Sequence, residues 1–185
     1  EETVAYLTGV RRDPRLHAVV IALGQELLVV SGLAKNDEDG RRLLEEVLVS
    51  GEAAERFEKM VSELGGPADL LTGFSRYLPK APVMYEVNAD ERGSIVSMDA
   101  RALGQIVAEL GGGRTHPTDT IDPAVGIDHC ARVGGKLDRG SVLCRVHART
   151  RANAEYASQR IRAAFVVDTQ PAPYTPLVRE VLREA

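Results

Sequence analysis

The stretch MDARALGQIVAELGGGRTHPTDTIDPAVG, residues 98–126, joins a helix, a glycine loop and an acidic turn without a spacer. Asp99 stands where the N-cap of a helix is expected, and apolar residues then recur at helical spacing. We therefore predict a short amphipathic helix that ends at the glycines. Its buried stripe comprises Leu103, Ile106, Val107 and Leu110.

Three consecutive glycines, Gly111, Gly112 and Gly113, follow this helix. Such a run has a large backbone-entropy cost, so it indicates a need for positive φ, close backbone approach or mobility. A phosphate-binding glycine loop follows a strand and opens a helix, whereas these glycines follow a helix. The order is therefore wrong for a phosphate-binding loop, and a plain helix end is one explanation of the glycines.

Length and composition limit the class of protein. The chain has 185 residues, 44% of them hydrophobic, which is enough to build the core of one large domain or of two small ones. A net charge of −4 provides no basic face for nucleic acid or an anionic membrane. No apolar run approaches the roughly 18 to 20 residues of a membrane span, and no signal peptide stands at the start. We expect a cytoplasmic, globular chain.

The first third of the chain has the period of helices. Asp13 followed by Pro14 predicts a helix start, and so does Asn36 followed by three carboxylates. Residues 13–64 therefore predict three helices separated by glycines. The chain lacks an initiator methionine and opens directly into apolar residues at helical spacing, so we expect it to begin inside a longer protein.

From Pro82 the period becomes that of strands, and later of strands mixed with helices. Residues 90–93 predict a turn, and the prolines of the tail leave residues 177–182 as a small docking helix or a frayed end. Together with the helix after Asp99, this order predicts an α+β fold for residues 81–185. The other expected elements are strands at 83–87, 95–98 and 142–146, a helix at 154–164 and a short strand at 165–167.

Two acidic residues and one histidine near the glycines could carry chemistry. Asp119 and Asp122 could form an acid–base or metal pair, but hydrogen bonding within a turn is the simpler explanation. His116, beside the glycines, is retained as a functional possibility.

The remaining histidines and the cysteines have structural interpretations. His17, His129 and His147 lie in expected helices or strands and lack partner ligands at metal spacing. Cys130 and Cys144 also lack metal-type spacing, and we expect a reduced pair of small core residues. No metal site is predicted.

Several long motifs, in one order, resemble the C-terminal part of the thymidine phosphorylase family. The resemblance covers almost all of the chain and implies an α/β-hammerhead domain over residues 81–185. Residues 1–80 would then be the helical, incomplete end of the family's large α/β domain. The motifs are YLTGVRRDPRL (6–16), LVVSGLAKND (28–37), RYLPKAP (76–82), SMDARALG (97–104), GGGR (111–114), DTIDPAVG (119–126) and the run from His129 to His147.

The resemblance implies a pentosyltransferase. Members of the family exchange the base of thymidine for phosphate, reversibly, giving thymine and 2-deoxy-D-ribose 1-phosphate. Phosphate is the co-substrate, no other cofactor is implied, and the full-length enzyme is a homodimer. The family's catalytic and substrate-binding residues lie upstream of the residue that matches Glu1. We therefore assign no catalytic or substrate-binding residue and expect the chain alone to be inactive.

One candidate site remains. In the family, the glycine loop faces the cleft between the domains and becomes ordered as they close, which implies a closure role here. We then expect Gly112→Val to impair turnover more than stability. The candidate loop consists of Gly111, Gly112, Gly113, Arg114, Thr115 and His116.

Three alternatives stay open. The first is a pyrimidine-nucleoside phosphorylase of broader specificity, which also accepts uridine. The second is a swinging-arm module, because residues 133–143 are similar to the closing hairpin of lipoyl and biotinyl carrier domains, although Lys136 stands inside the glycine turn. The third is a regulatory or dimerising module without activity.

Overall fold

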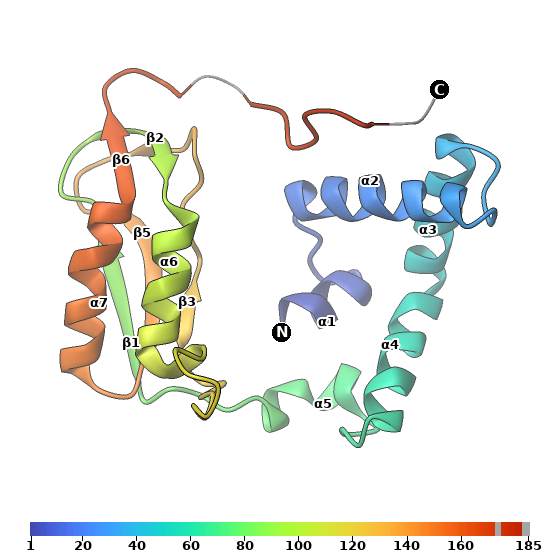
Figure 1. The fold of residues 1–185 in the computed structure, drawn as a ribbon, viewed down its shortest axis with the longest axis horizontal. Coiled ribbons are helices and arrows are strands. Elements are labelled where there is room, and N and C mark those ends of the chain that lie inside the picture. The colour runs from blue at the N-terminus through green and yellow to red at the C-terminus, as the bar shows by residue number, and fades with distance from the viewer. Residues whose placement is uncertain (173–174, 183–185) are drawn as a thin grey trace. The chain divides into compact units, whose positions relative to one another are not determined.

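The computed structural model describes residues 1–172 and 175–182. It divides into two compact units, Glu1–Tyr77 with the tail from Thr175, and Leu78–Tyr174. The first unit is built from helices, and the second contains every strand of the described chain (Figure 1). The predicted α+β class is confirmed. Over the same described residues, no helix is both long and apolar enough to cross a membrane.

The helices of the first unit begin where the sequence predicts. The Asp13 carboxylate accepts hydrogen bonds from the amides of Arg15 and Leu16, and the Asn36 side chain accepts one from Asp39. The last short helix of the unit was not predicted. The elements are α1 (Glu2–Leu7), α2 (Pro14–Val30), α3 (Asp37–Ser50), α4 (Glu52–Glu63) and α5 (Leu70–Tyr77).

Two glycines let α2 and α3 pack closely. A Cβ atom on Gly40 would lie 3.1 Å from the Cα of Gln25, and one on Gly24 would lie 2.7 Å from a methyl group of Leu44. The buried cluster of this unit is small because long apolar side chains of α2, Leu23 and Leu27 among them, are 69% exposed. The buried members of the cluster are Tyr6, Ile21 and Leu48.

The second unit contains two three-stranded antiparallel sheets. Strands that follow each other in sequence belong to different sheets. Each sheet is therefore assembled from strands that lie far apart in the sequence. One sheet has the order β1 (Val83–Asn88), β5 (Val142–Ala148), β3 (Gly126–Asp128), and the other has the order β4 (Lys136–Leu137), β2 (Gly93–Met98), β6 (Phe165–Asp168).

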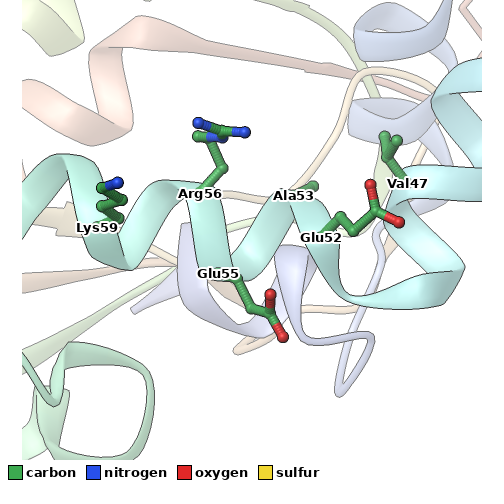
Figure 2. Close-up of a pocket in the computed structure, with 6 residues that line it drawn as sticks. All are labelled: Val47, Glu52, Ala53, Glu55, Arg56 and Lys59. Atoms are coloured by element: carbon green, nitrogen blue, oxygen red, sulfur yellow. The ribbon is translucent and has the colours of Figure 1, made fainter.

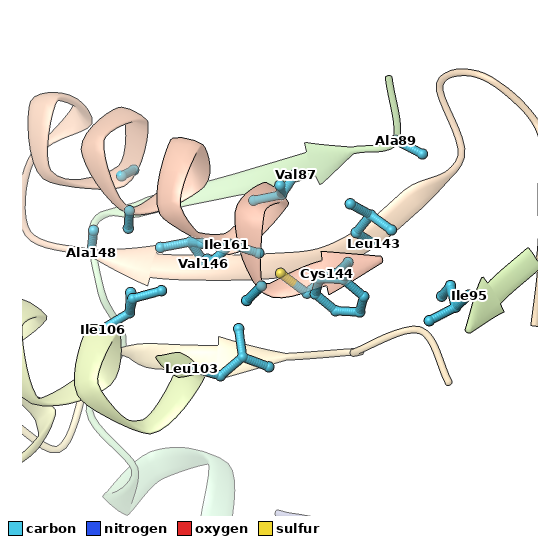
Figure 3. Packing of buried hydrophobic residues seen from close by; sticks show 14 of the residues in the cluster. Val87, Ala89, Ile95, Leu103, Ile106, Leu143, Cys144, Val146, Ala148 and Ile161 are labelled. Carbon is cyan, nitrogen blue, oxygen red and sulfur yellow. The ribbon is translucent and has the colours of Figure 1, made fainter. Parts of the chain in front are cut away.

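Two helices, α6 (Ala100–Val107) and α7 (Arg151–Ala164), pack with the sheets around one apolar core (Figure 3). The inward face of α7 consists mainly of small residues, which brings the helix close to β1 and β5. The large side chains at the centre are fully buried. They include Val87, Ile95, Ile106, Val146 and Ile161.

Three features differ from the sequence-based expectations: the hairpin around Lys136, the helix in the tail and the burial of Cys130. Residues 133–143 form no hairpin, because β4 pairs with β2 while β5 pairs with β1 and β3. Lys136 lies in strand β4, not in a turn, which removes the likeness to a lipoyl-type hairpin. Residues 175–182 contain no helix, so the docking helix, one of the two alternatives for residues 177–182, does not form. Cys144 is buried as expected, but Cys130 is exposed.

Candidate functional site: the glycine loop

The helix that leads into the glycine loop forms as predicted. The Asp99 carboxylate accepts a hydrogen bond of 2.9 Å from the amide of Ala102, and Leu103 and Ile106 are buried. The helix then widens into one π-helical turn, η1 (Ala108–Gly112). Within this turn Gly111 has a φ of 101°, a conformation that favours glycine and ends the regular helix.

The three glycines are required for different reasons. Gly111 provides the positive φ, and the nearest atom to a Cβ there would be 3.8 Å away. A Cβ on Gly112 would lie 2.9 Å from a methyl group of Val107 and 3.3 Å from the carbonyl oxygen of Val125, and one on Gly113 would lie 3.1 Å from the Cβ of Ala108. Because Gly112 is tightly packed, we expect Gly112→Val to reduce stability as well as turnover.

Asp119 holds the exposed part of the loop in a turn. One of its carboxylate oxygens accepts hydrogen bonds from the Thr115 hydroxyl (2.7 Å), the Thr115 amide (3.0 Å) and the His116 amide (2.8 Å). These bonds, the Thr115 hydroxyl first, lower the pKa of Asp119. The carboxylate thus has the structural role in a turn that the sequence favours for it.

Asp122 fastens the far end of the loop. Its amide donates to the carbonyl oxygen of Gly111 (2.8 Å), and its carboxylate accepts from the Ala124 amide (3.0 Å). Both carboxylate oxygens also accept from the guanidinium of Arg149, at 2.5 and 2.7 Å, and this pairing is the main cause of a lowered pKa for Asp122. Arg149 directly follows β5. Asp122 therefore ties the C-terminal end of the loop both to Gly111 and to the end of this strand.

The middle of the candidate loop is exposed. Arg114, Thr115 and His116 all face solvent. The His116 side chain is 79% exposed, and its Nδ1 lies 3.2 Å from the Thr115 hydroxyl and 3.7 Å from the Asp119 carboxylate. The loop therefore presents a guanidinium and an imidazole on a backbone whose two ends are fixed.

A small hollow of about 120 Å³ lies beside the loop, between α6 and α7. Leu110 and Glu109 of η1 line one side of it, and Asn153 and Tyr156 of α7 line the other. Glu109 also forms an ion pair with Arg160, which connects η1 to α7.

A polar cluster around Asp128 was missed by the sequence analysis. Its carboxylate accepts two hydrogen bonds of 2.9 Å from Arg145 and lies 3.2 Å from both His147 and His129. Burial raises the pKa of Asp128, but the bonds from Arg145 and His147 outweigh it and lower the pKa to about 2. The sequence does show that Arg145 and His147 lie two residues apart, on one face of a strand. It does not show that Asp128 lies beside them, because this depends on the pairing of β3 with β5.

Other candidates have structural settings. His17 shares a 2.9 Å hydrogen bond with Tyr6 in the first unit. Within the described part of the chain, no three His, Cys, Asp or Glu side chains come together as a possible metal site. A hollow along α4 is lined by charges of both signs, with Glu55 and Arg56 pointing to opposite sides of the helix, so it selects no ligand charge (Figure 2).

Comparison with known proteins identifies relatives of the whole chain. Residues 94–168, which contain the glycine loop, match the family model of the pyrimidine nucleoside phosphorylase C-terminal domain. A thymidine phosphorylase of Burkholderia orbicola (strain MC0-3) is 46% identical over 96% of this chain and 41% of its own length. One of Burkholderia cenocepacia (strain J2315) is 47% identical over 93% of this chain and 40% of its own length. The chain spans about 40% of the length of these curated relatives.

Proposed function

Because this chain belongs to the pyrimidine nucleoside phosphorylase family and corresponds to its C-terminal portion, we propose that it functions as the C-terminal part of a thymidine phosphorylase. One observation carries the proposal. The 46% identity extends over 96% of the chain, so it includes the helices of the first unit as well as the domain matched by the family model.

In this proposal the complete enzyme converts thymidine and phosphate reversibly to thymine and 2-deoxy-D-ribose 1-phosphate. It is a cytoplasmic homodimer, and phosphate is its co-substrate with no further cofactor. Residues 1–80 form the end of its large α/β domain, and residues 81–185 form its α/β-hammerhead domain. The catalytic residues lie outside this chain, so the chain alone does not catalyse phosphorolysis.

The glycine loop acts in domain closure in the same proposal. Supporting this role, Gly111 gives the backbone a turn that other residues adopt poorly, and Asp122 with Arg149 fixes the base of the loop. The residues between, Arg114 to His116, remain exposed. A loop with fixed ends and an exposed middle can change the direction of its side chains without unfolding the core.

The experiment is a chimera. The matching portion of the Burkholderia cenocepacia thymidine phosphorylase is replaced by this chain, and thymine release is measured with thymidine and phosphate. We expect phosphate-dependent release from the chimera and none from the 185-residue chain alone. A chimera that folds, by circular dichroism and gel filtration, but releases no thymine would contradict the proposed function. Thymine release by purified chain free of host enzyme would contradict the placement of the catalytic residues.

Two further measurements refine the proposal. Uridine in place of thymidine tests the alternative of broader specificity, which predicts comparable rates with both nucleosides. Arg114→Ala and His116→Ala in the chimera test the loop, because both side chains are exposed and their loss should leave the melting temperature unchanged. A closure role predicts a clear fall in turnover in at least one of them, whereas full turnover in both would refute it.

A further inference from the structure

We propose that Cys130 and Cys144 form a peroxide-reactive thiol pair, in which Cys130 is the attacking thiol and Cys144 closes a disulfide between strand β5 and the segment that follows β3. This site is separate from the glycine loop and does not depend on the proposed phosphorylase activity.

Cys130 lies two residues beyond the end of β3, and the backbone at His129 acts as a bulge that sets it opposite Cys144 of β5. The regular register joins Ile127 to Val146 and Asp128 to Arg145, and its continuation would place His129, not Cys130, across from Cys144. His129 instead has a φ of 51°, a left-handed conformation.

The hydrogen bonding resumes one residue out of register after this bulge. The amide of Ala131 donates to the carbonyl oxygen of Leu143 at 2.7 Å. In the shifted register Cys130 faces Cys144. Opposed residues on antiparallel strands have Cβ atoms about 4.5 to 5.5 Å apart, and a disulfide needs about 3.5 to 4.5 Å. Only a small movement is therefore needed to join the two sulfur atoms.

The two cysteines have opposite surroundings. Cys144 is fully buried in the core beside Leu143 and Val146 (Figure 3), whereas Cys130 is exposed. The neighbouring Cys144 thiol lowers the pKa of Cys130 to about 7, although partial desolvation and the nearby Asp128 carboxylate raise it. The same contact, together with burial, raises the pKa of Cys144. The exposed Cys130 is therefore the thiol that ionises more readily, and the buried Cys144 holds its proton more firmly.

The chemistry balances with a hydroperoxide as oxidant. The Cys130 thiolate attacks the terminal oxygen of hydrogen peroxide, so that an S–O bond forms, the O–O bond breaks and hydroxide leaves to take up a proton. The Cys144 sulfur then attacks the sulfenic acid at Cys130. An S–S bond forms, the S–O bond breaks, and the Cys144 proton leaves with the hydroxide as water. Two thiols and one peroxide give one disulfide and two waters.

The test uses the full chain and hydrogen peroxide. After a short treatment at neutral pH, intact mass should fall by two hydrogen atoms, both thiols should resist iodoacetamide, and a proteolytic digest should contain the Cys130–Cys144 cross-link. Dithiothreitol should restore both thiols. Without peroxide, alkylation of Cys130 should have a pH midpoint near 7.

Variants separate the two roles. Cys130→Ser should leave Cys144 unreactive, and Cys144→Ala should leave a monomer oxidised at Cys130 with no internal cross-link. Loss of the Cys144 thiol should also return the pKa of Cys130 toward that of a free thiol and slow its alkylation about tenfold at pH 7. If the alanine variant folds poorly, Cys144→Ser replaces it in the cross-link test only, because the serine hydroxyl still donates a hydrogen bond.

Three outcomes would overturn the proposal. They are thiols that both survive the treatment, oxygen addition at Cys130 of the wild-type chain without a disulfide, and a cross-link between the Cys130 residues of two chains. Each of these outcomes is identified by mass spectrometry of the wild-type protein, so the test does not depend on whether a variant folds.

Discussion

At the scale of single residues, each of the three consecutive glycines is required for its own reason, either a positive φ or the lack of space for a side chain. Gly111→Ala keeps the space but strains a positive φ, so we expect a loss of about 1 kcal/mol of stability. Gly112→Val inserts a branched side chain against Val107 and the carbonyl of Val125, and we expect a larger loss, about 2 kcal/mol or more. Urea unfolding of each variant gives the two values.

The matched control for both variants is Gly104→Ala. Gly104 lies in α6, has ordinary helical backbone angles, and a methyl group added there would meet no atom within 4 Å. An alanine there should stabilise the chain by about 0.5 to 1 kcal/mol. If Gly112→Val unfolded at the same urea concentration as wild type, the tight packing described for this glycine would be incorrect.

Asp128 makes the stability of the chain depend on pH in a defined direction. Its pKa is about 2 in the folded chain and about 3.9 when unfolded, so its contribution is present above pH 4 and is lost as the pH falls through 2. Because this carboxyl is 41% exposed, solvent screening reduces the contribution to about 1 kcal/mol. We expect Asp128→Asn to be less stable than wild type by that amount at pH 6.

The control for Asp128→Asn is a carboxyl that, within the described part of the chain, accepts no hydrogen bonds like those from Arg145 to Asp128. Asp138 is 81% exposed, and Asp138→Asn should unfold like wild type throughout. The difference between wild type and Asp128→Asn should shrink below pH 4 and vanish only below pH 2. A difference that stayed constant over this range would show that Asp128 acts by shape and not by charge.

At the scale of elements, the ion pair between Asp122 and Arg149 should decide how firmly the glycine loop is held. Arg149→Met keeps the length of the side chain but removes both hydrogen bonds to the carboxylate. We expect the amides of residues 111–125 to exchange hydrogen for deuterium several-fold faster, while the amides of α7 are unchanged. Overall stability should change little, since the arginine is half exposed.

Arg151→Met is the control for this measurement. Arg151 pairs with Glu155 on the surface of α7, one turn away along the same helix, and makes no contact described for the loop. Its removal should leave exchange in residues 111–125 as in wild type. Equal effects of the two substitutions would mean that the loop responds to lost charge in general and not to its anchor.

The sequence predicts elements better than it predicts their partners. Capping residues such as Asp13, Asn36 and Asp99 act within one turn of a helix, so the starts of α2, α3 and α6 follow from the sequence. The pairing of β1 with β5 and the bulge at His129 depend on residues far apart in the chain. For this reason the Asp128 cluster and the facing cysteines could not be predicted, and Cys130 was wrongly assigned to the core.

At the scale of the whole molecule, the two units should differ in how well they fold alone. The second unit buries large side chains such as Ile95, Ile106 and Ile161 completely, whereas long apolar residues of the first, Leu23 and Val30 among them, remain exposed. Limited proteolysis should therefore cut within residues 1–80 first and leave a protected product that contains residues 81–168. Mass spectrometry of the products identifies it, and a protected helical unit with a degraded sheet unit would reverse this order.

The antiparallel sheets also determine when the second unit can fold during synthesis. Val83 of β1 pairs with Ala148 of β5, and Ser94 of β2 pairs with Asp168 of β6. Neither sheet can therefore be completed until its last strand has left the ribosome, and such distant pairing slows folding. A nascent chain halted before Phe165 would hold β2 with one unpaired edge, which makes β6 the strand whose arrival protects the rest from aggregation.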